Sequence, residues 1–135
     1  MSEFVWPVRV YFEDTDAGGI VYHAQYLNFM ERARTEWLRY NQFEQQALLQ
    51  SDVQMVVSSL GCRYLRPAVL DDALDIVVNV SALGACSMTF RQQVVRSGEL
   101  LCEASVDIAC IGTSSQRPKR WPGAMRNVLE REINP

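Results

Sequence analysis

The spacing of apolar residues changes once in the first third of the chain. Val8, Val10 and Phe12 alternate with their neighbours in the period of two that predicts a half-buried strand. From about Gln25 to Tyr40, apolar residues recur instead at intervals of three and four, which predicts the longest helix of the chain. The apolar stripe of this helix consists of Tyr26, Phe29, Met30, Ala33 and Trp37.

The charged residues of this helix are expected on its solvated face. Arg32 with Glu36, and Glu31 with Arg34, have the spacing of ion pairs on a helix surface. Each such pair stabilises a helix by about 0.2–0.5 kcal/mol. The helix is therefore predicted to turn one apolar face inward and one charged face outward.

Beyond residue 52 the pattern favours strands. A weak helical segment over residues 43–49 comes first, and strands are predicted over residues 53–65, 74–82, 87–96 and 100–111. Ser97-Gly98-Glu99 is a short connection that suits a hairpin, and a last helix is predicted from Pro122 onward. The expected fold class is α+β, with one long helix across an antiparallel sheet whose last four strands form a meander. All 135 residues are expected to form a single domain.

Composition and charge exclude several classes of function. The chain is 48% hydrophobic and 21% charged, which is ordinary for a globular protein with a core. Its 13 basic and 16 acidic residues give a net charge of −3, so nucleic acid is an unexpected partner. The chain has no basic start followed by a long apolar run and no stretch of eighteen apolar residues. We therefore expect no transmembrane segment, and we expect a cytoplasmic location.

The cysteines do not form a metal-binding or disulfide pattern. Cys62, Cys86, Cys102 and Cys110 lie far apart, and His23 is the only histidine. The strand over residues 100–111 places Cys102 and Cys110 on its apolar side. We therefore expect buried, reduced thiols and no metal site.

The densest candidate chemistry lies in EDTDAGGIVYH, residues 13–23. Asp14, Asp16 and Gly19 match three positions of a calcium-binding EF-hand loop, but Gly18 and Gln25 occupy positions that should supply ligands. Phosphate-binding glycine motifs and the G-x-S-x-G motif of serine hydrolases are absent. A carboxylate is therefore the expected catalytic group.

Asp16 is the carboxylate best placed for catalysis. It could attack a carbonyl itself or orient a water molecule that does so. The Gly18-Gly19 pair lets backbone approach a ligand, and the amides near Tyr22 and His23 lie where the long helix begins. Such amides could hold the negative oxygen that forms when a thioester carbonyl is attacked. The alternatives are that Asp16 only caps a turn, that the glycines only form one, and that the His23 side chain only packs at the helix start.

The run RVYFEDTDAGGIVYHAQYLNFMERAR, residues 9–34, resembles the signature of the 4-hydroxybenzoyl-CoA thioesterase family, and most closely its Tol-Pal-associated acyl-CoA thioesterase branch. The signature positions are occupied by Arg9, Thr15, Asp16, Gly19, Ile20, Val21 and His23. The resemblance implies a hotdog fold, active sites at the subunit boundaries of a homodimer or homotetramer, and hydrolysis of an acyl-CoA or acyl carrier protein thioester. It implies Asp16 as the catalytic carboxylate and the His23 amide as the group that polarises the carbonyl, with Gly19 and Tyr22 near the substrate. No metal or redox cofactor is implied, because CoA belongs to the substrate.

One segment departs from the family pattern. Members that act on hydroxybenzoyl-CoA carry a basic cluster between the third and fourth strands, where this chain has Leu83-Gly84-Ala85-Cys86-Ser87. Arg117, Lys119 and Arg120 are therefore proposed to contact the CoA nucleotide, the alternative being a solvated charged tail. Two rival functions remain: a hotdog dehydratase that uses His23, and a non-enzymatic acyl-carrier-binding or scaffold module of an envelope-associated complex.

Overall fold

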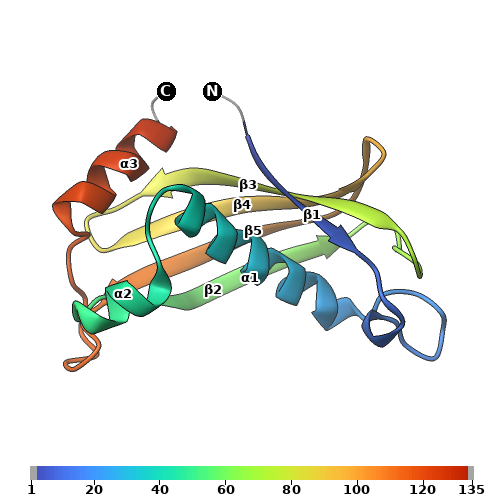
Figure 1. Cartoon of the computed structure of the whole chain (residues 1–135), viewed down its shortest axis with the longest axis horizontal. Helices are drawn as coiled ribbons and strands as arrows, with labels where there is room; N and C mark the ends of the chain where they lie inside the picture. The colour runs from blue at the N-terminus through green and yellow to red at the C-terminus, as the bar shows by residue number, and fades with distance from the viewer. Residues whose placement is uncertain (1–2, 134–135) are drawn as a thin grey trace.

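A computed structural model describes residues 3–133 and shows one five-stranded antiparallel sheet with a long helix along one face (Figure 1). The strands are β1 (Phe4–Arg9), β2 (Gln54–Tyr64), β3 (Ala73–Leu83), β4 (Ser87–Arg96) and β5 (Glu99–Ile111). The helices are α1 (His23–Tyr40), α2 (Gln45–Gln50) and α3 (Gly123–Ile133), with a short 3-10 turn η1 (Phe12–Asp14). The predicted α+β class and hotdog fold are confirmed.

The sheet order is β1-β3-β4-β5-β2, which corrects the predicted meander. Strands β3, β4 and β5 do follow one another, and Ser97 and Gly98 join β4 to β5 with φ angles of +49° and +82°. This pair of positive angles is the geometry of a tight hairpin turn. β2, however, crosses to the far side and pairs with β5 instead of with β3.

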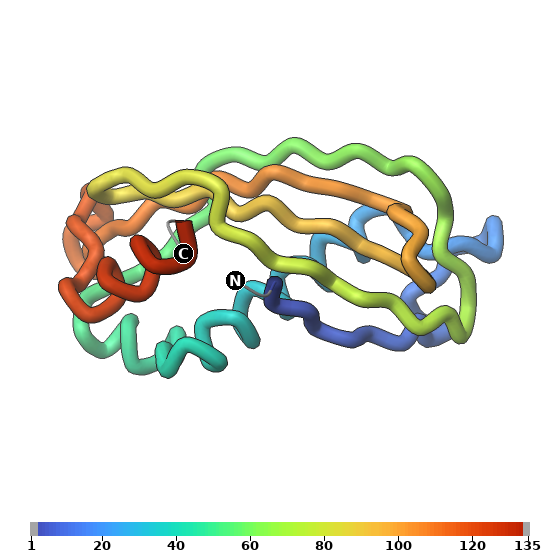
Figure 2. Tube along the Cα trace, turned by 90° about the horizontal axis from the view of Figure 1, so that it is seen from above, coloured from blue at the N-terminus to red at the C-terminus, as the bar shows by residue number. Residues whose placement is uncertain are grey.

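The core lies between α1 and the sheet, and Figure 2 shows the strands arching along the helix. Phe29, Met30 and Trp37 of α1 pack against residues such as Phe90 of β4, whose ring meets that of Trp37 edge to face at 5.2 Å. Burying a side chain of this size contributes about 1.5–3 kcal/mol. Cys102 and Cys110 are completely buried on β5, as expected, whereas Cys62 and Cys86 are only half-buried. All four are free thiols.

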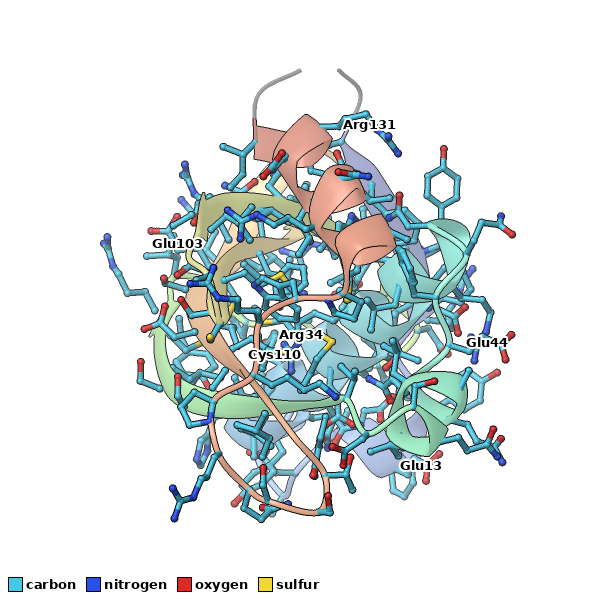
Figure 3. All side chains as sticks on the ribbon, turned by 90° about the vertical axis from the view of Figure 1, so that its left-hand side faces the viewer. Glu13, Arg34, Glu44, Glu103, Cys110 and Arg131 are labelled. Atoms are coloured by element: carbon cyan, nitrogen blue, oxygen red, sulfur yellow. The ribbon has the colours of Figure 1, made fainter. Side chains whose placement is uncertain are left out.

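Two sequence predictions about local structure were wrong. The first strand ends at Arg9, and Phe12 lies in η1 with 81% of its surface exposed. Arg34, predicted on the solvated face of α1, is buried and donates from Nη1 to the Gln92 side chain of β4 at 2.8 Å. Figure 3 shows Arg34 within the body of the molecule, whereas Glu13 and Glu44 lie at its outside.

No helix among residues 3–133 is long and apolar enough to cross a membrane. The long helix α1 carries charged residues between its buried positions, and the other two helices are shorter.

Candidate active site

The turn before α1 is organised around Asp14, which is 6% exposed. Its carboxylate accepts the Tyr11 N–H at 2.8 Å and the side-chain amide of Gln25 at 2.7 Å. Its main-chain carbonyl accepts the Tyr22 N–H at 3.0 Å. One residue therefore links the end of β1, the entry to α1 and the first turn of that helix. The sequence pattern indicates Asp14 only as part of an incomplete calcium-binding loop, so its role in holding this turn is visible only in the structure.

Asp16 lies at the tip of this turn, with its side chain exposed in the single chain. Its Oδ1 accepts the Gly18 N–H at 2.8 Å, which fixes the carboxylate against the loop. A Cβ on Gly18 would lie only 3.2 Å from that oxygen, and Gly19 has a φ of +83°, which other residues rarely adopt. The two glycines are thus suited to holding this carboxylate in place.

Asp16 also lines a cavity of about 370 Å³. The other lining residues are Ile20, Val21, His23, Tyr26, Tyr64, Leu65, Arg66 and Pro67. Most of these side chains are apolar or aromatic, so the carboxylate borders a largely apolar hollow. The structure therefore brings Asp16 and His23 together at one cavity, as the proposed mechanism requires.

The start of α1 presents main-chain donors at this cavity. Tyr22 is the N-cap residue and makes no side-chain capping hydrogen bond. Among residues 3–133, the main-chain N–H of His23 has no main-chain acceptor, in contrast to those of Tyr22 and Gln25. An unpaired N–H at the positive end of a helix is a ready donor to an anionic oxygen.

Tyr64, at the end of β2, forms the facing wall. Its hydroxyl donates to the main-chain carbonyl of His23 at 2.8 Å, and its ring meets that of Tyr26 at 5.4 Å. The His23 imidazole packs on Tyr22, with ring centroids 4.6 Å apart. No group of three or more His, Cys, Asp or Glu side chains that could hold a metal is found in residues 3–133.

The loop between β2 and β3 forms a further wall of the cavity, which is lined by its residues 65–67. Ala68 in this loop donates its N–H to the Tyr26 hydroxyl at 2.9 Å and accepts the Val21 N–H at 2.9 Å. Asp72 accepts the Val69 N–H at 2.9 Å and an Arg96 N–H at 2.8 Å. Burial raises the pKa of Asp72, but these two hydrogen bonds outweigh that effect and hold it below the ordinary value.

The basic tail lies at the other end of the molecule. Lys119 contacts Asp52, just before β2, with its Nζ donating to the Asp52 carbonyl at 2.9 Å. β2 has 11 residues, and its far end, Tyr64, lines the cavity. Because a strand rises about 3.3 Å per residue, roughly 33 Å separates the two ends. Within one chain, the tail of Arg117, Lys119 and Arg120 does not meet the cavity beside Asp16.

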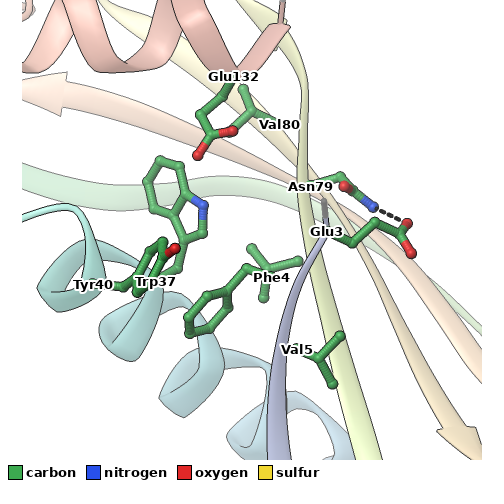
Figure 4. Close-up of a pocket in the computed structure, with 9 residues that line it drawn as sticks. Glu3, Phe4, Val5, Trp37, Tyr40, Asn79, Val80 and Glu132 are labelled. Atoms are coloured by element: carbon green, nitrogen blue, oxygen red, sulfur yellow. Dashed lines mark hydrogen bonds between the residues drawn. The ribbon is translucent and has the colours of Figure 1, made fainter. Parts of the chain in front are cut away.

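Size alone does not locate this site, because the structure has larger hollows elsewhere. One of about 470 Å³ lies between β1, β3, α1 and α3, where the Asn79 side chain donates to Glu3 at 2.9 Å (Figure 4). The cavity beside Asp16 differs from it in combining a carboxylate with the His23 main-chain N–H, which has no main-chain acceptor among residues 3–133.

Comparison with known proteins agrees with this arrangement. The family described as the Thioesterase-like superfamily matches residues 10–129. The chain belongs to this superfamily. The expected membership among 4-hydroxybenzoyl-CoA-type thioesterases, and with it the class of thioester hydrolase, is confirmed.

Two relatives and one crystal structure illustrate the similarity. "Acyl-CoA thioester hydrolase YbgC" of Escherichia coli O6:H1 is 47% identical over 88% of this chain and 90% of its own length. "Acyl-CoA thioesterase YbgC" of Haemophilus influenzae is 45% identical over 88% of each chain. The crystal structure of a probable thioesterase from Bartonella henselae is 35% identical, with a TM-score of 0.84 over 90% of this chain and all of that one.

Proposed function

We propose that this protein hydrolyses acyl-CoA thioesters with the Asp16 carboxylate as catalytic group and the His23 main-chain N–H as donor to the developing oxyanion. The observation that carries the proposal is that both groups border one largely apolar cavity. The names of the relatives, which are acyl-CoA thioester hydrolases, support the substrate class.

The reaction adds one water molecule to the thioester and yields a carboxylic acid and a free thiol. Asp16 either takes a proton from the attacking water or attacks the carbonyl carbon itself, in which case water then cleaves the resulting anhydride. In both routes the carbonyl oxygen becomes negative in the transition state. A main-chain N–H at a helix start stabilises that oxygen without having to reorient.

The Asp16→Asn substitution tests the proposal. The amide nearly keeps the shape of the side chain but can neither accept a proton readily nor act as the nucleophile. We expect kcat for acyl-CoA hydrolysis to fall by about 10²–10⁴-fold, the usual contribution of a general base. Free thiol released from acyl-CoAs of graded length is measured with a thiol reagent.

Glu13→Gln is the matched control, because it removes an exposed carboxylate of the same turn that does not line the cavity. It should retain wild-type activity. If Asp16→Asn kept wild-type kcat, the proposal would fail. Label found in the Asp16 carboxylate by mass spectrometry after a single turnover in ¹⁸O-water would identify attack by Asp16, since water that cleaves the anhydride at the Asp16 carbonyl leaves its oxygen in the protein.

We also propose that two chains pair through their β2 edges. β2 is a long outer strand with exposed apolar side chains, including Val57 and Leu60, whereas the opposite edge strand β1 has six residues and contains Pro7. Proline on an edge strand hinders further pairing, and a long open edge favours it. When two copies of the same strand pair about a two-fold axis, they run antiparallel.

Antiparallel pairing would bring the basic tail of one chain close to the cavity of the other. The start of β2 in one chain would lie beside the end of β2 in the other, so Arg117 of the partner subunit would approach the cavity next to Tyr64. Arg117 and Arg120 are exposed, whereas Lys119 is partly engaged with Asp52. The proposed contact with CoA phosphates therefore acts between subunits and falls mainly to the two arginines.

The remaining expectations complete the proposal. Gly19 and Tyr22 are sequence neighbours of cavity-lining residues and are proposed to contact the substrate, an acyl group carried by CoA or by an acyl carrier protein. We propose a cytoplasmic enzyme whose reaction needs neither a metal ion nor a redox cofactor. A panel of matched acyl-CoA and acyl-carrier substrates decides between the two carriers through their kcat/KM values.

A further inference from the structure

Tyr26 is the most buried polar side chain that lines the cavity. It lies one helical turn after His23 and is only 3% exposed. Its hydroxyl oxygen accepts the Ala68 N–H at 2.9 Å, and Ala68 in turn accepts the Val21 N–H at 2.9 Å. The hydroxyl is therefore fixed against the loop that forms one wall of the cavity.

The hydrogen of this hydroxyl has no acceptor among residues 3–133. A phenol both accepts and donates, and the Ala68 N–H satisfies only its accepting side. The neighbouring Tyr64 hydroxyl is already used, because it donates to the His23 carbonyl. A buried hydroxyl with an unused hydrogen beside a cavity is suited to donating to whatever fills that cavity.

Two further features favour donation by Tyr26. A hydroxyl that accepts one hydrogen bond becomes a better donor of the next, because the bonds in a chain polarise one another. Burial raises the pKa of Tyr26, even though the Ala68 hydrogen bond lowers it in part. The hydroxyl therefore keeps its proton at neutral pH.

We infer that Tyr26 is a further catalytic residue, whose hydroxyl donates to the oxyanion of the bound thioester alongside the His23 N–H. The inference rests on the proposed function, since it assigns a second donor to the same reaction. Tyr26 transfers no proton and makes no covalent bond. It supplies a hydrogen bond that is strongest when the carbonyl oxygen carries negative charge.

Tyr26→Phe is the first test, and Tyr64→Phe is its matched comparison. Both substitutions remove one hydroxyl and keep a ring in the same aromatic cluster, but the Tyr64 hydroxyl is committed to the His23 carbonyl. For Tyr26→Phe we expect kcat to fall by about 10²-fold, the usual loss for one oxyanion donor, with KM changed less than threefold. For Tyr64→Phe we expect a smaller loss of kcat. Unchanged kcat in Tyr26→Phe, with only a lower Tm or a higher KM, would show that the hydroxyl merely holds the loop.

A second measurement separates donation from anchoring directly. Tyr26 is replaced by a fluorinated tyrosine whose hydroxyl ionises closer to neutral pH. The ionised oxygen still accepts the Ala68 N–H but has no hydrogen to donate. We expect kcat to fall as the pH rises through this ionisation, which is followed by absorbance, while Tm does not fall.

The charged or ionisable groups whose charge acts on the Tyr26 hydroxyl are Cys102, Arg96 and Asp72. The other ionisable residues that line the cavity are Asp16, His23, Tyr64 and Arg66. All of these groups are also present in the wild-type protein, whose pH profile of kcat serves as the reference. A kcat profile of the fluorinated protein that matched the wild-type profile would overturn the inference. Wild-type kcat in Asp16→Asn would instead contradict the proposed function, so the two failures are distinguishable.

Discussion

At the scale of single residues, the two aspartates of the turn differ in kind although only one residue separates them. Asp14 is buried and its carboxylate is bonded to the Tyr11 N–H and the Gln25 side chain, whereas Asp16 is exposed at the cavity and, among residues 3–133, its carboxylate accepts only the Gly18 N–H. Asp14 therefore shapes the turn and leaves Asp16 available for chemistry. Sequence alone did not separate these roles, because the partners of Asp14 include a residue eleven positions away.

Replacing Asp14 with Asn should destabilise the protein without acting on the chemistry directly. One amide oxygen cannot replace both carboxylate acceptors, and leaving a buried donor unpaired costs about 1–3 kcal/mol. We expect the free energy of unfolding to fall by that amount, measured by urea denaturation. Glu13→Gln should leave it within about 0.5 kcal/mol, as is usual for an exposed position. Equal stability of the two variants would contradict the structural role of Asp14.

Arg34 shows that local spacing also misses partners distant in sequence on the surface of a helix. Its spacing from Glu31 predicted an exposed ion pair, but α1 turns this flank toward the sheet, where Gln92 accepts from the guanidinium and donates to the Met30 carbonyl. Burial lowers the pKa of Arg34, with Glu31 opposing that effect. The helical period places Arg34 beside the apolar stripe, and only the facing strand shows that a polar partner is present there.

At the scale of elements, the helices and the last strands were predicted well and the first strand was not. β4 was predicted over the residues it occupies, and α1 begins two residues before the predicted start. The alternation was correct for Val8, but Val10 already lies beyond the last residue of β1, and extending the strand to Phe12 was wrong because Asp14 folds the chain into η1. The hydrogen bond from the Tyr11 N–H to the Asp14 carboxylate thus overrides the local alternation of apolar residues.

The loop between β2 and β3 should make the protein sensitive to acid through Asp72. Because the folded-state pKa of Asp72 is lowered, its contribution to stability is present above the ordinary carboxyl pKa of about 3.9 and is lost as the pH falls through the lower folded value. Asp72→Asn should reduce stability at pH 7 by about 1 kcal/mol. It should also flatten the decline below pH 4, measured by urea unfolding at several pH values. A variant that loses stability with acid as steeply as the wild-type protein would exclude Asp72 as a cause.

At the scale of the whole molecule, the sheet has two unlike edges, and the site lies near only one of them. β2 ends at Tyr64 in the wall of the cavity, and its outer side is unpaired in the single chain. Asp16 is correspondingly exposed on that chain. A second copy at the β2 edge would cover apolar surface and bring the basic tail to the cavity.

Val57→Lys tests this assembly. Val57 is 49% exposed on β2, and a lysine there would place like charges at the proposed interface. We expect the dimer to dissociate at micromolar concentration in analytical ultracentrifugation, with a rise in KM for acyl-CoA of at least tenfold. Val5→Lys makes the same change at 44% exposure on the other edge strand and should preserve the dimer. Dissociation in Val5→Lys alone would place the interface at β1.

The elements and the chemical signature of the turn could be predicted from local sequence, because both depend on residues close together along the chain. The period of α1, the hairpin at Ser97-Gly98 and the spacing of Asp16 from His23 are all local patterns. Tertiary structure alone decided that β2 pairs with β5, that Asp14 and Tyr64 frame the site, and that the basic tail lies far from Asp16. These features come from contacts between residues distant in sequence, whose partners are chosen by packing and by the need to pair buried polar groups.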